Sequence, residues 1–297
     1  MFKTGFLALI LFLLLALPAG ADDRISEEAM ASFEKAVIHY NGGRIQTARG
    51  LFHAVASESP GFLEAWFYLG MCEQHLGRYG DSIPFLEKAA VLDPQFLSVQ
   101  YYLALAYHEI GRDSQAKTHL RTVLALKHDH GEALFLTGMI AGKEGRKEDE
   151  LRFLTEAARV SPELFEARYN LGLVHLERGQ PGEAVAHLRA AVELRPDVQE
   201  AGDLLARAYE KLGRLDEAIQ LYEGLVKKAP EDSSRRLVLG TLYLRNGQAD
   251  AAAEVLSSAC EGDPTSDCWF NLGAAYQRVE EWDRAAEAFN KAAALSP

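Results

Sequence analysis

The sequence of 297 residues is 48% hydrophobic and 25% charged, and its formal net charge is −12. This acidity argues against nucleic acid and anionic lipid as partners, because binding to their phosphates requires clustered Lys and Arg. The three cysteines form no CxxC pair, so the usual thiol motif for metal binding or redox catalysis is missing.

Residues 1–21 have the pattern of a secretory signal peptide, in which Lys3 precedes an apolar run at residues 6–17 and small residues precede the expected cleavage site. The run is about a dozen residues long, whereas a membrane-spanning helix needs roughly 20, so an uncleaved anchor is the minor alternative. No Cys follows to accept a lipid. We therefore expect an exported bacterial protein, periplasmic or secreted, whose only membrane contact is through the signal peptide before cleavage.

Glycine recurs at a constant spacing through the rest of the chain. The seven glycines, each 34 residues from the next, are Gly43, Gly77, Gly111, Gly145, Gly179, Gly213 and Gly247. Prolines keep the same spacing, except that His128 stands at one junction. A period of this length predicts a stacked array. Each unit is expected to have two amphipathic helices, a glycine turn between them and a proline before the next pair.

The repeating unit resembles the tetratricopeptide repeat over nearly all of residues 29–297. One unit carries the resemblance best, through Ala65-Trp66, Leu69-Gly70, Leu76-Gly77-Arg78-Tyr79, Ala89 and Asp93-Pro94. The resemblance implies an all-α fold, a right-handed α-solenoid of about eight stacked helix-turn-helix repeats. After a short lead-in at residues 22–28, the repeats are expected to start near Ala29, Leu63, Leu97, Gly131, Phe165, Gln199, Ser233 and Ser266.

Two local features stand out within the array. Ser26, followed by Glu27 and Glu28, is expected to cap the first helix, with the acidic residues at the positive end of its dipole. The fourth repeat departs most from the family pattern, because Glu150 replaces the usual alanine and Ala141 stands where Tyr is common.

Aromatic residues occupy one position on the first helix of each of the first five repeats. The resemblance implies that this face lines the concave groove of the superhelix. The candidate partner-binding residues are Phe33, Phe67, Met71, Tyr101, Leu105, Phe135, Met139, Tyr169 and Leu173. An exposed apolar stripe predicts a groove for an apolar or aromatic peptide segment. The alternative is that these aromatics pack against the neighbouring repeat.

The stripe changes character in the last three repeats. The sixth repeat breaks it with Asp203, Arg207 and Glu210, and Asp203 is expected to pair with Arg207 one helical turn away. The seventh and eighth repeats return to a more apolar face through Leu237 and Phe270.

The cysteines have different expected roles. Cys260 and Cys268 flank an inter-helix turn, and the helix-to-helix geometry could bring them within disulfide distance; the alternative is two free thiols. Cys72, next to Gly70, is expected to be a core residue rather than a nucleophile, because no His or Asn motif supports catalysis there.

Catalytic and metal-binding motifs are missing from the sequence. His119, His128, His130 and Glu132 gather near one junction, but no second pair of ligands stands at a recognised spacing, so a solvated polar turn is favoured. There is no HExxH, no GxSxG and no phosphate-binding glycine loop. We expect no catalytic residue, cofactor, metal or small-molecule substrate.

These patterns predict a non-enzymatic scaffold that binds a protein or peptide partner through the groove, in a cell-envelope assembly or secretion process. The alternative is a structural homo-oligomer that associates through its last repeat, because no polar capping helix follows that repeat and arrays usually need one. A metal-binding protein or an enzyme accessory subunit is the remote third hypothesis.

Overall fold

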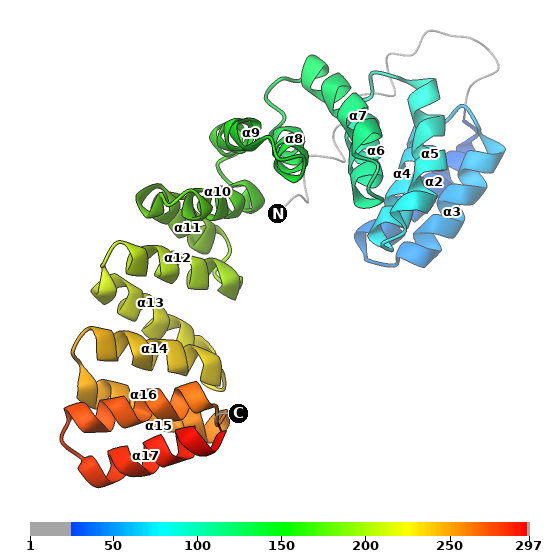
Figure 1. Cartoon of the computed structure of the whole chain (residues 1–297). Helices are drawn as coiled ribbons and strands as arrows, with labels where there is room; N and C mark the ends of the chain where they lie inside the picture. The colour runs from blue at the N-terminus through cyan, green and yellow to red at the C-terminus, as the bar shows by residue number, and fades with distance from the viewer. Residues whose placement is uncertain (1–24, 296–297) are drawn as a thin grey trace. The chain divides into compact units, whose positions relative to one another are not determined.

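A computed structural model describes residues 25–295, which form sixteen α-helices and no strand within that range (Figure 1). The all-α solenoid predicted from the 34-residue period is confirmed. The predicted signal peptide at residues 1–21 lies outside the described residues. Within them, every helix is too short or too polar to cross a membrane.

The chain divides into two compact units, unit 1 at residues 1–128 and unit 2 at residues 129–297. Unit 1 contains α2 (Glu27–Asn41), α3 (Ile45–Glu58), α4 (Leu63–His75), α5 (Tyr79–Leu92), α6 (Leu97–Glu109) and α7 (Asp113–Leu126). Unit 2 contains α8 (Gly131–Lys143), α9 (Lys147–Val160), α10 (Phe165–Glu177), α11 (Pro181–Leu194), α12 (Gln199–Lys211), α13 (Leu215–Lys228), α14 (Ser233–Arg245), α15 (Ala249–Gly262), α16 (Ser266–Arg278) and α17 (Trp282–Leu295).

The first helices of seven repeats begin at the residues predicted from the sequence, and α2 begins at Glu27, slightly before the predicted Ala29. Three-residue turns join the two helices of each pair. The seven periodic glycines have φ between 69° and 77°. Residues with a side chain are strained in this backbone conformation, whereas glycine is not. The last turn has no glycine, and Glu280 adopts φ 62° there.

Small residues let the two helices of a pair approach closely. A Cβ atom added to Gly70 would come within 2.6 Å of Leu86, and the same crowding places Leu256 against Gly240. The leucines that fill these positions are fully buried, together with the periodic alanines. The core of each unit is therefore a thin layer that continues from one helix pair to the next, as expected for stacked repeats.

Two local predictions can be compared directly with the structure. The Ser26 side chain accepts a hydrogen bond from the backbone N–H of Ala29 at 3.0 Å, which confirms the predicted N-cap of α2. In the fourth repeat, Glu150 is buried against Gly142 and accepts a hydrogen bond from Lys147 Nζ at 3.0 Å. The unusual glutamate therefore fills the space that a glycine on the facing helix leaves open.

Candidate binding surface

Two of the predicted groove residues are core residues in the structure. Phe33 is only 3% exposed, and its ring centroid lies 4.9 Å from that of Phe62 and 5.7 Å from that of Tyr68. Phe67 is 9% exposed and lies 5.7 Å from the rings of both Phe96 and Tyr102. The prediction that these two residues line an open groove is corrected: an aromatic residue from the next repeat covers each ring, which is the packing alternative.

The other seven candidates are half-buried rather than enclosed. In unit 1 they are Met71, Tyr101 and Leu105, and in unit 2 they are Phe135, Met139, Tyr169 and Leu173. Tyr169 stacks on Phe165 of its own helix, with ring centroids 5.6 Å apart. These residues keep part of their surface accessible, so their role in binding stays a prediction.

Two buried polar residues of unit 1 lie on α4, the helix that carries Phe67. Glu73 is 1% exposed and pairs with Arg49 Nε. Gln74 donates to the carbonyl oxygen of Tyr102 at 2.8 Å, which ties α4 to α6. Burial raises the pKa of the neighbouring Cys72 thiol to about 12, so it stays protonated and unreactive near neutral pH, as its expected core role requires.

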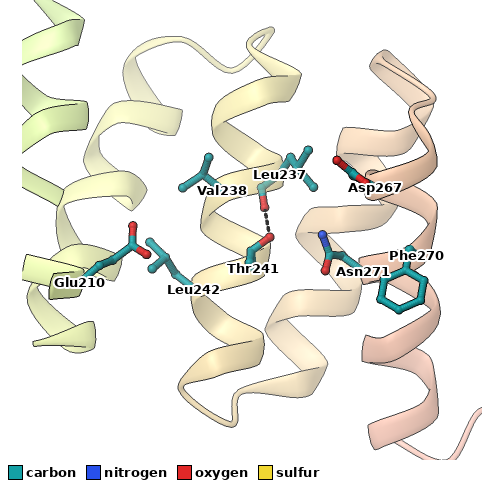
Figure 2. Close-up of a pocket in the computed structure, with 8 residues that line it drawn as sticks. All are labelled: Glu210, Leu237, Val238, Thr241, Leu242, Asp267, Phe270 and Asn271. Atoms are coloured by element: carbon teal, nitrogen blue, oxygen red, sulfur yellow. Dashed lines mark hydrogen bonds between the residues drawn. The ribbon is translucent and has the colours of Figure 1, made fainter. Parts of the chain in front are cut away.

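A pocket of about 330 Å³ opens on unit 2 between the first helices of the last three repeats, α12, α14 and α16 (Figure 2). It is lined by Glu210, Leu237, Val238, Thr241, Leu242, Asp267, Phe270 and Asn271. Phe270 is 59% exposed, and its only described ring contact is with Phe289, at 5.5 Å between centroids. An aromatic ring with this much solvent-exposed surface is a favourable contact for an apolar side chain of a ligand.

The polar atoms of this pocket are mostly acceptors. Thr241 donates its hydroxyl hydrogen to the carbonyl oxygen of Leu237 at 2.8 Å, which leaves only lone pairs for a ligand (Figure 2). Glu210 pairs with Arg245, whereas Asp267 forms no ion pair among the described residues. Asn271, which projects between α14 and α16, supplies both a donor and an acceptor.

Asp203, which breaks the aromatic stripe, has a structural role. Its carboxylate lies 3.8 Å from the guanidinium of Arg235, which is only 6% exposed and also lies 3.3 Å from Asp232. Asp203 therefore pairs with Arg235 on α14, and the predicted pairing with Arg207 is wrong. Burial raises the pKa of Asp203, and the positive charge of Arg235 opposes that rise.

Cys260 and Cys268 form a disulfide in the structure, with their Cα atoms 5.6 Å apart. The bond joins the end of α15 to the first turn of α16, and both cysteines are buried. Cys268 directly follows Asp267 and stands two residues before Phe270. The disulfide therefore anchors the wall of the pocket that α16 provides.

The histidines near the third and fourth repeats serve packing and capping. His119 stacks on Tyr107 at 5.5 Å and bonds to Gln100 Oε1 at 2.8 Å, and burial lowers its pKa. His130 accepts a hydrogen bond from the N–H of Ala133 at the start of α8. In the part of the chain that the structure describes, no three His, Cys, Asp or Glu residues are placed to hold a metal ion.

The pocket lies in the sixth to eighth repeats, whereas the predicted site residues lie in the first five. Leu237 and Phe270 hold the same helical position as Phe67, so the sequence pattern already indicates that the apolar face returns in the last two repeats. Exposure made the difference: Phe67 is covered by the next repeat, whereas Phe270 is not. A sequence pattern assigns a side chain to a helix face but does not reveal what covers that face.

Family models match most of the array. Two models described as tetratricopeptide repeat match residues 33–95 and 98–126. A model of anaphase-promoting complex subunit 3 matches residues 144–225, and a model of the C-terminal domain of cilia and flagella-associated protein 70 matches residues 197–297. No curated protein matches the sequence.

Solved structures share the fold at low sequence identity. YrrB, described as a TPR protein with an unusual peptide-binding site, is 20% identical, with 60% of this chain and 92% of that chain covered and a TM-score of 0.54. PilF of Pseudomonas aeruginosa is 21% identical, with 74% and 96% covered and a TM-score of 0.56. PilW, described as a widely conserved type IV pilus biogenesis factor, is 15% identical, with 69% and 95% covered and a TM-score of 0.60. At these identities the likeness concerns the fold alone.

Proposed function

The chain belongs to the tetratricopeptide repeat family, and from that premise we propose that it is a non-enzymatic scaffold that binds an extended segment of a protein partner. Repeat proteins of this kind present long binding surfaces to their partners. The residues of this chain that contact the partner lie on the exposed side of the first helices. Asn271, Thr241 and Phe270 of unit 2 are the principal ones, and the half-buried candidates of unit 2 extend the surface there. The half-buried candidates of unit 1 form a surface of that unit alone.

The pocket between α12, α14 and α16 is the observation that carries this proposal (Figure 2). Peptide-binding sites combine an apolar recess for side chains with hydrogen-bonding groups for the backbone. Leu237 and Phe270 provide the recess, and Asn271 can bond to a peptide N–H and a peptide C=O at once.

The setting we propose is the cell envelope. The support for it is the signal-peptide pattern of residues 1–21 and the acidic, soluble character expected of the remaining chain. YrrB is described as a TPR protein with an unusual peptide-binding site, and PilW is described as a type IV pilus biogenesis factor. A comparable role, capture of a peptide segment during envelope assembly or secretion, is proposed for this chain.

A pull-down from the host envelope tests the proposal. Residues 22–297 serve as bait, and the double variant Phe270→Ala/Asn271→Ala is expected to recover at least tenfold less of the partner, because it removes the aromatic wall and the amide. Circular dichroism should show unchanged helix content, since both side chains are accessible. Equal recovery by the variant and the wild type would exclude this surface.

Trp282 provides the matched control and tests the second candidate function. This residue of α17 is 61% exposed and lies outside the pocket, which favours it as a contact in a self-associating oligomer. Trp282→Ala should leave partner recovery unchanged if the scaffold proposal holds. Light scattering that shows an oligomer in the wild type and a monomer in Trp282→Ala would favour the structural oligomer instead.

A further inference from the structure

We propose that the pocket of unit 2 takes a basic side chain, Lys or Arg, together with a neighbouring apolar side chain of the same partner segment. This inference rests on the proposed scaffold function and specifies the chemistry of the partner. The evidence is the charge and the hydrogen-bonding character of the lining, considered with its one exposed aromatic ring.

The lining carries negative charge without a matching cation of its own. Two of its eight residues, Glu210 and Asp267, are carboxylates, and none is Lys, Arg or His. Arg245 compensates Glu210 from outside the pocket. Asp267 has no ion-pair partner among the described residues, so its carboxylate is available to a ligand.

The hydrogen-bonding groups of the lining also favour a positively charged ligand. The carboxylates of Glu210 and Asp267 only accept, and the hydroxyl of Thr241 has its hydrogen directed to Leu237. Asn271 is the single side chain of the lining with hydrogen atoms left to donate. A ligand that brings several N–H donors, such as an ammonium or a guanidinium group, satisfies this lining better than one that brings acceptors.

The apolar part of the pocket requires a second side chain. Phe270 and Leu237 lie on α16 and α14, with Asn271 between the two helices (Figure 2). The volume of about 330 Å³ is at the low end of ligand sites, which span roughly 300–1,000 Å³, and suits one or two side chains rather than a folded domain. An aromatic or aliphatic residue fits against Phe270, with the basic group directed toward Asp267.

An acidic segment is disfavoured by the same arrangement. It would bring like charge to Asp267 and Glu210 on a chain whose net charge is already −12. Charge complementarity therefore selects basic partners at this pocket.

The test is selection from a displayed library of random twelve-residue peptides against residues 22–297, followed by fluorescence anisotropy with the enriched peptides. We expect Lys or Arg within four residues of an aromatic or aliphatic residue.

Asp267→Asn should weaken binding roughly tenfold, because it removes one charge-assisted hydrogen bond. The dissociation constant of the wild type should rise with added NaCl, and this dependence should flatten in Asp267→Asn. Glu254→Gln, which removes one exposed charge from α15, is the control and should bind like the wild type.

The outcomes separate the inference from the proposed function. Peptides that need Phe270 but are neutral or acidic, or that bind Asp267→Asn as well as the wild type, overturn the basic-ligand inference alone. Selection that enriches no peptide, or only peptides that bind Phe270→Ala unchanged, counts against the proposed function of this surface. A melting temperature of Asp267→Asn equal to that of the wild type shows that the variant is folded.

Discussion

At the scale of single residues, the most informative side chain is Arg235. A guanidinium that is 6% exposed needs charge compensation, and the carboxylates of Asp203 on α12 and of Asp232, the N-cap of α14, provide it. The interruption of the aromatic stripe at the sixth repeat is therefore a requirement of the core between α12 and α14. An isolated sequence shows the interruption but not the cation that explains it.

Asp203→Ala is expected to destabilise the protein by about 2 kcal/mol or more, because it leaves Arg235 buried with only one compensating carboxylate. Urea unfolding followed by circular dichroism measures the change. Arg207→Ala is the matched control: this residue is exposed on the same helix, and its removal should cost less than about 0.5 kcal/mol. Equal losses in the two variants would contradict the role assigned to Asp203.

His187 makes stability depend on pH. Burial, together with the nearby charges of His175 and Arg168, lowers its pKa from 6.5 to about 4. In the unfolded chain His187 binds a proton below about pH 6.5, whereas in the folded chain it does so only below about pH 4. Between these values the unfolded state binds more protons, so His187 lowers the free energy of unfolding as the pH falls. The ring is partly exposed, which limits the effect to about 1 kcal/mol.

His187→Gln should therefore reduce the loss of thermal stability between pH 7 and pH 5. Melting curves of the variant and the wild type, recorded by circular dichroism at both values, give the comparison. Parallel decreases in the two melting temperatures would show that His187 does not contribute.

At the scale of the helices, the sequence determined most of what the structure contains. The period predicted the starts of the first helices because glycine turns and close-approach positions are local requirements that recur in every repeat. The exposure of a given face could not be predicted, since it depends on residues such as Tyr68 and Tyr102 that belong to the next helix pair. For this reason the sequence pattern places Phe33 and Phe67 on the groove face, although the structure buries both.

Gly240→Ala should destabilise the protein by about 1–3 kcal/mol, because the added methyl group collides with Leu256 of the paired helix. Gly224→Ala, on the exposed side of α13, meets no atom within 4 Å and should stabilise it by about 0.5–1 kcal/mol through higher helix propensity. Thermal melting of the two single variants measures both effects. If both changes were neutral, the close helix approach described for these pairs would be incorrect.

At the scale of the whole molecule, the repeat pattern is continuous although the chain divides into two units. The division falls between His128 and Asp129, at the junction where histidine stands in place of proline. The residues that recur with the repeat period are those that pack the two helices of one pair together, and they are nearly the same in all eight repeats. Their recurrence therefore predicted where seven of the eight first helices begin, but gave no indication that the described residues divide into two compact units between His128 and Asp129.

The mature protein is expected to begin at Asp22. Small residues before that position fit the cleavage rule for secreted proteins. Mass spectrometry of the intact protein purified from its native host measures the start directly, with the same gene expressed without residues 1–21 as the reference for its mass. A chain that retains residues 1–21 in the host envelope would instead support the anchored alternative.

The bond between Cys260 and Cys268 has a consequence for how the repeats come apart. Helix pairs in a stack contact only their neighbours, so they fray pair by pair. The covalent link joins α15 of one pair to α16 of the next, and neither can open far while the other stays closed. The free energies of opening obtained from amide hydrogen exchange should be the same for these two helices while the bond is intact, and should differ between them after a reductant has cleaved it.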